Sequence, residues 1–257
     1  MSPWRPFEHA AAPHHDAHSL TRQWTALHRG DAEPLPQDPA LLEAWVLYHN
    51  GAFDQARLAG MALGWPGAAV VLKSTCVYAV YLEPRESTRL ALLKEAADYA
   101  VAHQQHQPDC PAAWYGQAYA LGRFSQGISV AKALTQGLGQ RIQAALRRTM
   151  ELRPHHADAH LALAMFHAEV IDKVGTLIGG LTHGASKREA LALFEQALQL
   201  NPDAAIPLNE YANGLLMLEG EASLAKVTAL QERVAALAPR DAMECLYLDA
   251  ARLAPDE

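Results

Sequence analysis

Three histidines have types and spacing that could bind a metal ion. His156, His160 and His167 share one face if the segment HHADAHLALAMFH is helical. Imidazole is a common zinc ligand, and a metal-dependent hydrolase could use such a face. Asp158 points away from His160 on that helix, and neither a fourth ligand nor a second layer of hydrogen bonds is apparent. We therefore expect packed or partly exposed histidines and no bound metal or other cofactor, with the hydrolase site as the less favoured alternative.

A glycine-rich segment, GTLIGGLTHGASK at 175–187, could bind phosphate through its backbone amides. In a nucleotide-binding loop of this kind a lysine directly follows the last glycine, and a β-strand precedes the loop. Here two residues separate Gly184 from Lys187, and the preceding sequence reads as a helix. We therefore expect a glycine-rich link between two helices, with Ser186 and Glu189 forming a capping box where the next helix begins.

No arrangement for nucleophilic catalysis is recognisable in the sequence. Its serines occur in no Gly-X-Ser-X-Gly context. The three cysteines, Cys76, Cys110 and Cys245, lie far apart, in no zinc-like spacing and with no recognisable histidine partner. We expect reduced, packed thiols and a protein that is not an enzyme.

Composition and charge exclude several classes of partner. The chain of 257 residues carries a net charge of -7, so it lacks the positive surplus that binds nucleic acid phosphates. It has no uncharged apolar run of about 18 residues, as a membrane-spanning helix needs, and no apolar core typical of a secretion signal. We expect a cytoplasmic protein with no nucleic-acid binding and no membrane insertion. A partly flexible segment at 1–37 should precede a helical domain at 38–257.

From about residue 38 onward the sequence is typical of α-helices. Ala and Leu are frequent, and the alternation typical of strands is rare. Asp38 is a candidate N-cap with Pro39 at the first helical position, and DAME at 241–244 has a similar form. These signals predict an all-α fold of about twelve helices.

The helices repeat along the chain. Each copy runs from a helix end into a proline, a short polar turn and a new helix, and small residues flank Phe194 as closely packed helix pairs require. The clearest copies are TMELRPHHADAHLALAMFH at 149–167, ALQLNPDAAIPLNEYANGL at 197–215 and AALAPRDAMECLYL at 235–248.

This pattern resembles the tetratricopeptide repeat, a helix–turn–helix unit of 34 residues that ends in a proline. The resemblance is close at 187–202 and extends loosely over about 40–240. It implies a right-handed α–α superhelix, or solenoid, with two enlarged repeats between Pro108 and Pro202. Residues 110–202 are also similar to the T-component of TRAP-transporter-associated lipoproteins and to the regulator of microtubule dynamics family, which are thought of as binding or scaffold proteins.

In tetratricopeptide proteins the first helix of each pair lines a concave groove that binds a partner. Tyr and Arg are frequent anchors of interfaces, and asparagines four residues apart can hold a peptide backbone. The resemblance therefore implies a non-catalytic scaffold that binds a partner protein or peptide. Alternatively, some of these side chains pack on neighbouring helices or face water. The matching positions are Tyr115, Tyr119, Arg123, Leu161, Met165, Glu169, Asn209, Asn213 and Met217.

A second interpretation is a carrier for a hydrophobic small molecule. The segments ISVAKALTQGLG at 128–139 and VGTLIGG at 174–180 are apolar, and such surface is costly to expose unless it is packed or used in binding. A channel near these two insertions could hold the ligand. The sequence leaves open whether the glycine-rich insertion at 172–186 borders that channel.

Overall fold

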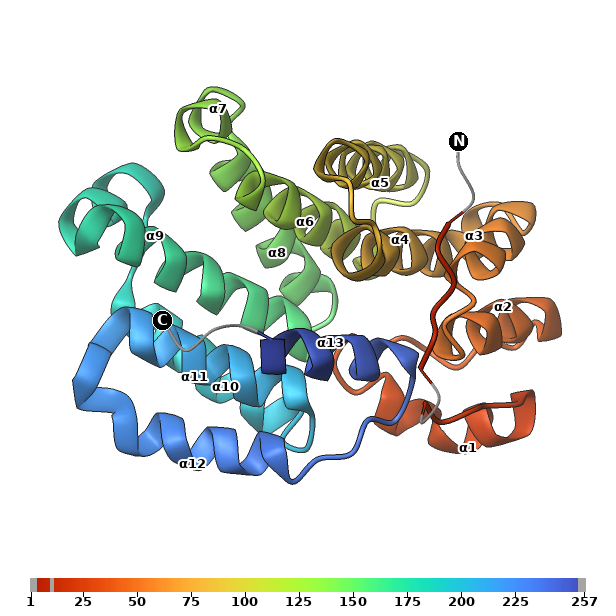
Figure 1. Cartoon of the computed structure of the whole chain (residues 1–257). Coiled ribbons are helices and arrows are strands. Elements are labelled where there is room, and N and C mark those ends of the chain that lie inside the picture. Colours follow the sequence, from red (N-terminus) through yellow and green to blue (C-terminus); the bar gives the residue numbers. More distant parts are fainter. Residues whose placement is uncertain (1–3, 10–11, 254–257) are drawn as a thin grey trace. The chain divides into compact units, whose positions relative to one another are not determined.

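A computed structural model describes residues 4–9 and 12–253 of the chain (Figure 1). Over these residues the protein contains helices and no strand, which confirms the all-α prediction. The chain forms two compact units. Unit 1 comprises the described residues of Met1–His28, Glu33–Ala145 and Pro239–Glu257, and unit 2 comprises Arg29–Ala32 and Leu146–Ala238.

Unit 1 is built from helices of both ends of the chain. They are α1 (Ala17–Leu27), α2 (Pro39–His49), α3 (Phe53–Ala62), α4 (Ala68–Val77), α5 (Glu86–His106), α6 (Pro111–Gln126), α7 (Val130–Thr135) and α13 (Ala242–Leu253), with short turns η1 (Trp65–Gly67) and η2 (Tyr78–Leu82). As predicted, Asp38 caps α2 by accepting a 2.9 Å hydrogen bond from the Ala40 amide, and Pro39 is its first residue.

Helix α8 (Leu138–Leu152) spans the boundary between the units: it belongs to unit 1 up to Ala145 and to unit 2 from Leu146 onward. The other helices of unit 2 are α9 (Ala157–His183), α10 (Lys187–Leu200), α11 (Ala205–Glu219) and α12 (Leu224–Ala235), with the turn η3 (Gly220–Ser223) before α12.

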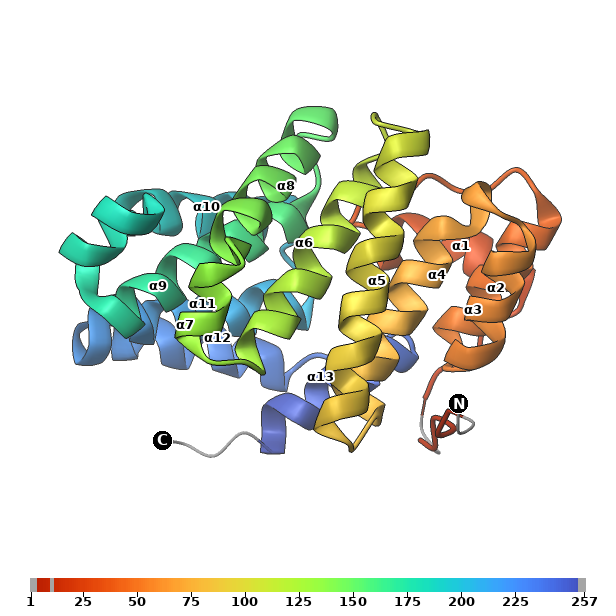
Figure 2. The same ribbon diagram turned by 90° about the horizontal axis from the view of Figure 1, so that it is seen from above.

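In both units a helix packs against the next helix and often against the next but one. In unit 1, α2 contacts α3 and α4, and α4 in turn contacts α5 and α6, so that α2 to α6 follow one another across the unit (Figure 2). In unit 2, α9 contacts α10 and α11, and α11 contacts α12. Each unit is therefore a set of helical hairpins in which the first helices of successive pairs touch.

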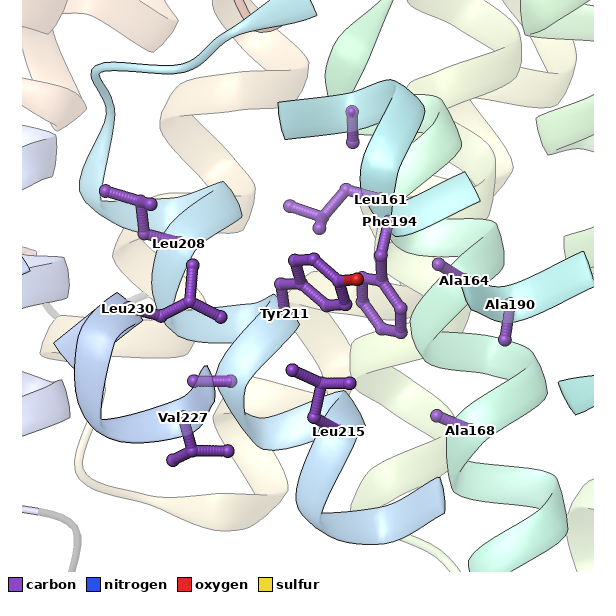
Figure 3. Close-up of a cluster of buried hydrophobic side chains, with 12 residues drawn as sticks. Leu161, Ala164, Ala168, Ala190, Phe194, Leu208, Tyr211, Leu215, Val227 and Leu230 are labelled. Carbon is purple, nitrogen blue, oxygen red and sulfur yellow. The ribbon is translucent and has the colours of Figure 1, made fainter. Parts of the chain in front are cut away.

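The core of unit 2 is a cluster of buried apolar side chains from α9 to α12 (Figure 3). Phe194 and Tyr211 stack at its centre, with ring centroids 5.0 Å apart and planes 12° apart. Ala190 and Ala197 are fully buried on the same helix as Phe194, as expected from the small residues around it. The cluster comprises Leu161, Ala164, Ala168, Ala190, Phe194, Ala197, Leu208, Tyr211, Ala212, Leu215, Val227 and Leu230.

The glycine-rich segment is mostly helical, so the predicted link at 175–187 is wrong for most of its length. Helix α9 continues to His183 and departs from helical geometry only at Gly175, whose φ is 78°. It ends at Gly184 in the left-handed conformation that glycine adopts at low cost. Ser186 then caps α10 by accepting from the Glu189 amide, as predicted, while the Glu189 side chain bonds Arg147 at 2.8 Å.

The C-terminal helix does not simply extend the series of hairpins. Helix α13, expected from the sequence as part of a further repeat at 235–248, packs against α2 and η2 in unit 1. The segment ahead of Asp38, expected to be partly flexible, contains α1, and residues 4–9 lie extended along unit 1 beside α2 and α3 (Figure 1). Unit 1 therefore includes both the first and the last described residues of the chain.

A close approach of two backbones in unit 1 leads to a first prediction. The Cβ of an alanine at Gly67 would overlap the carbonyl group of Gly60, and that backbone cannot move aside as a flexible side chain could. We expect Gly67→Ala to destabilise unit 1 by about 1–3 kcal/mol in urea unfolding followed by circular dichroism. Gly122→Ala is the matched control, because no atom lies near a Cβ at that site in α6. It should leave stability unchanged or raise it by up to about 1 kcal/mol, and equal stability of the two variants would contradict the prediction.

Candidate functional site

The nine predicted groove residues lie on three helices. Helix α6 of unit 1 carries three of them, and α9 and α11 of unit 2 carry six. Eight have partly exposed side chains, whereas Leu161 is 5% exposed and belongs to the core of unit 2. The eight are Tyr115, Tyr119, Arg123, Met165, Glu169, Asn209, Asn213 and Met217.

The three residues of α6 form a continuous row. The rings of Tyr115 and Tyr119 lie 6.1 Å apart, and the Arg123 guanidinium lies 5.4 Å from the Tyr119 ring centroid, within cation–π range. Arg123 also donates to Gln126 at 3.3 Å, which holds the guanidinium near the helix. This row offers aromatic faces and a cation, which suits contacts with peptide groups and side chains of a protein partner.

The residues of α9 and α11 lie on two helices that pack against each other. Met165 and Met217 lie against the buried cluster, and Glu169 pairs with Lys173 at 3.7 Å. Asn209 and Asn213 remain partly exposed on α11, one helical turn apart. This surface combines amide groups with flexible apolar side chains and the Glu169–Lys173 ion pair.

The structure does not bring the three histidines of 156–167 together as a set of metal ligands. His156 lies at the N-cap of α9, where its Nδ1 accepts from the Ala159 amide at 3.2 Å, and the His160 ring contacts the His156 carbonyl oxygen at 3.0 Å. His167 is fully buried and lies 3.6 Å from Glu189. Burial lowers the pKa of His167, although Glu189 opposes that shift. Among the residues that the structure describes, no three His, Cys, Asp or Glu side chains are placed to hold a metal.

A different set of histidines meets in unit 1, and the sequence analysis missed it. We call His28, His49 and Asp241 the histidine junction. His49 Nδ1 lies 2.7 Å from Asp241 Oδ2, and its Nε2 lies 3.1 Å from His28 Nε2. The three groups come from the C-cap of α1, the last residue of α2 and the residue before α13, where Asp241 accepts from the Glu244 amide. The junction therefore joins three helix ends.

Burial and charge set the proton positions in this junction. Burial lowers the pKa of His49 to about 4, although its hydrogen bond to Asp241 opposes the shift. Burial alone would raise the pKa of Asp241, but the contact with His49, the hydrogen bond from the Glu244 amide and the charge of Lys73 together hold that pKa below its usual value. At neutral pH His49 is therefore neutral and donates from Nδ1 to an ionised Asp241. All three groups are at most 5% exposed, so they can stabilise the helix ends but offer no surface to a substrate.

The last turns of α9 expose a group of aliphatic side chains. We call residues 176–183 the α9 tip. Leu177, Ile178 and Leu181 are 76%, 56% and 81% exposed, and residues 174–182 contain no charged side chain. The apolar character of this segment was visible in the sequence, whereas its helical form and its exposure were not.

A small cavity in unit 1 does not match the carrier interpretation. It has a volume of about 40 Å³ and is lined by residues of α3, α4 and α5, among them Arg57, Leu72, Glu95 and Tyr99. Pockets for small molecules usually measure about 300–1,000 Å³. None of the residues that line the cavity belongs to the segments 128–139 and 174–180 that suggested a channel.

Sequence comparison with known proteins indicates no function, so the function is inferred from the geometry of the structure. No protein-family model and no curated protein matches this sequence. Within the described part of the chain, none of the helices combines the length and the apolar character needed to cross a membrane. Each unit therefore carries its own candidate surface: the α6 row in unit 1, and the surface of α9 and α11 with the α9 tip in unit 2.

Proposed function

We propose that this chain is a non-catalytic interaction protein that binds a partner protein or peptide through a tetratricopeptide-like stack of helical hairpins. The packing of each unit supports this, because contacts of a helix with the next and the next but one are those of stacked hairpins. The first helices of such pairs, α9 and α11, carry most of the residues predicted to line the groove.

The observation that carries the proposal is the exposure of the α9 tip. Leu177, Ile178 and Leu181 together place an aliphatic surface in water, within a stretch at 174–182 that contains no charged residue. Burial of one such side chain by a partner would contribute about 1.5–3 kcal/mol, so exposed apolar surface of this kind marks interaction sites. A partner that covers the tip is therefore the simplest reason for its composition.

The α9 tip follows the predicted groove residues of α9 along the chain. Met165 and Glu169 lie on the same helix, and the tip follows them after the break at Gly175. A peptide lying along α9 could contact Asn213 of α11 and then reach Leu177 and Leu181. The proposal therefore assigns the tip and the groove to one binding surface within unit 2.

Photo-cross-linking in cells tests this surface. A cross-linker placed at 177 or 213 should capture a common partner, and the purified partner should bind Leu177→Ser/Leu181→Ser at least about tenfold more weakly than the wild type. Asn213→Ala should weaken binding less, because it removes polar contacts only. Tyr119→Ala tests whether the α6 row of unit 1 takes part.

The matched control is Leu224→Ser, which removes a 51% exposed leucine from α12 in the same unit. It should leave binding unchanged, and all these variants should keep the circular dichroism of the wild type. If the tip variant binds every captured partner as the wild type does, the α9 tip is not the binding surface. If Tyr119→Ala and Asn213→Ala also change nothing, the predicted groove is wrong as well.

A further inference from the structure

An extended segment of the chain, residues 4–9, lies on unit 1 and is held there by its side chains. We call it the N-terminal strap. Trp4 stacks on Tyr78, with ring centroids 4.1 Å apart and planes 6° apart, and the Arg57 guanidinium lies 5.6 Å from the Trp4 ring centroid. Phe7 meets Phe53 edge to face, with centroids 6.4 Å apart. Two aromatic residues three positions apart are thus the main anchors of the strap.

The surface beneath the strap is shaped for these anchors. Gly51 faces the Phe7 ring so closely that a Cβ at this position would overlap it, and Gly51 adopts a φ of 80°. Arg57 is fixed by a 2.5 Å hydrogen bond to Glu95, which sets the guanidinium toward Trp4. We call this surface, formed by Tyr78, Arg57, Gly51 and Phe53, the strap groove. It has one site for an indole, beside a phenol ring and a cation, and a second site for a phenyl ring.

Polar contacts add orientation to this fit. The Arg5 amide donates to the Tyr78 hydroxyl at 3.2 Å, and that hydroxyl donates to Glu83 at 3.2 Å. His9 lies 3.4 Å from Asp249 of α13. Arg5, Pro6 and Glu8 are exposed, so the middle of the strap faces solvent while Trp4 and Phe7 face the protein. Alternate anchoring of this kind is typical of a bound peptide.

The side chains that receive the strap would be left uncovered without it. Tyr78 and Phe53 are each 2% exposed with the strap in place. Departure of the strap alone would expose the parts of both rings that Trp4 and Phe7 contact, whereas exchange for another peptide with two aromatic anchors would keep them covered. The arrangement therefore favours exchange of one peptide for another over simple release.

We propose that this groove of unit 1 is a second peptide-binding site, and that the N-terminal strap occupies it as an internal ligand which a partner segment displaces. The partner segment is an extended peptide with a tryptophan, or a similar large aromatic residue, three positions before a phenylalanine. This site lies in the other unit from the α9 tip and does not depend on the function proposed for that surface. The strap raises the affinity that a partner must have, because an attached segment competes at an effective concentration in the millimolar range for short flexible connections.

Peptide binding in trans to the full chain tests the proposal. The probe is a fluorescent peptide of residues 4–12, WRPFEHAAA, and binding is followed by anisotropy. The full-length variant Trp4→Ser/Phe7→Ser, which vacates the groove, should bind the probe at least about tenfold more tightly than the wild type, whose own strap competes. A probe with the same two substitutions should not bind, whereas a probe with Glu8→Ser should bind like the original.

The control protein Glu8→Ser keeps both anchors and should resemble the wild type. A folded Trp4→Ser/Phe7→Ser protein that does not bind the probe, or binds it no better than the wild type does, would overturn the proposal. Leu177→Ser/Leu181→Ser should leave probe binding unchanged, which separates this site from the α9 tip.

Hydrogen exchange of the wild type provides a test that needs no variant. If the strap is displaceable, the Arg5 amide, which donates to the Tyr78 hydroxyl, should exchange through a local opening while α2, α3 and α4 stay protected. Addition of excess unlabelled WRPFEHAAA should increase the exchange of this amide. Exchange of the strap only together with α2 to α4 would show that it is a permanent part of the core, and the proposal would fail.

Discussion

Replacement of Phe194 by alanine is expected to destabilise unit 2 by about 3–5 kcal/mol. The Phe194 side chain is fully buried, stacks on Tyr211 and contacts residues of the cluster shown in Figure 3. Its removal loses the transfer free energy of the ring and leaves a cavity that helices packed on both sides cannot close. Native-state hydrogen exchange of α9 to α12 measures this loss for unit 2 by itself. Leu216→Ala, at a 40% exposed position of α11, should change the same quantity by no more than about 0.5 kcal/mol.

Gly214 allows a sharper test of the same contact. A Cβ at Gly214 would overlap the ring of Phe194, so Gly214→Ala should destabilise the wild type by about 1–3 kcal/mol. In the Phe194→Ala background that overlap is gone, and alanine is the better helix former by about 1 kcal/mol. Gly214→Ala should then be neutral or stabilising. Additive effects of the two substitutions would mean that the ring and the glycine do not meet as described.

Replacement of His49 by leucine is expected to destabilise unit 1 by about 3–5 kcal/mol at neutral pH. The substitution leaves Asp241 ionised and buried without the imidazole that now bonds it at 2.7 Å. Hydrogen exchange of α2 and α13 is the measurement, and His18→Leu, at an exposed histidine of α1, is the control. The double variant His49→Leu/Asp241→Asn should recover much of the loss, because asparagine still caps α13 and carries no charge.

The pH dependence of this variant provides a second criterion. In the wild type the pKa of His49 is about 4, against a usual value of 6.5. Between these values the unfolded chain binds a proton that the folded chain does not, so the stability of unit 1 is full above about pH 6.5 and falls as the pH drops toward about 4. The His49→Leu variant has no His49 and therefore does not show this loss. Its folded state also becomes more stable as the pH falls, because the buried Asp241 carboxylate takes up a proton and loses its charge. The difference between variant and wild type should therefore narrow from pH 7 to pH 4, and a constant difference would contradict this account.

Features of the fold that depend on neighbouring residues could be predicted from the sequence. Asp38 with Pro39 and Ser186 with Glu189 each placed a helix start correctly, because a cap needs only a side chain and an amide two or three residues away. The burial of Phe194 between small residues followed from helical spacing in the same way. These local rules sufficed for the all-α class and for the core of unit 2.

Features that depend on distant residues could not be predicted in this way. His28, His49 and Asp241 have no sequence spacing that indicates a contact, since only the return of α13 to α2 brings them together. The histidines at 156, 160 and 167 carried a clear periodic signal, yet the backbone uses two of those rings near the start of α9. The glycines of 175–184 suggested a link, but glycine weakens a helix by only about 1 kcal/mol per residue, and only Gly175 and Gly184 interrupt α9 while Gly179 and Gly180 lie within it.

The path of the chain through the two units has a consequence for synthesis. Unit 2 is nearly continuous in sequence, whereas unit 1 needs residues from before α2 and from 239 onward. During translation the hairpin of α9 and α10 can close before Asp241 leaves the ribosome, so His28 and His49 must wait without Asp241. Completion of the histidine junction is thus a late event in the life of each molecule, and a nascent chain that stops before Asp241 would carry a finished unit 2 beside an unfinished unit 1.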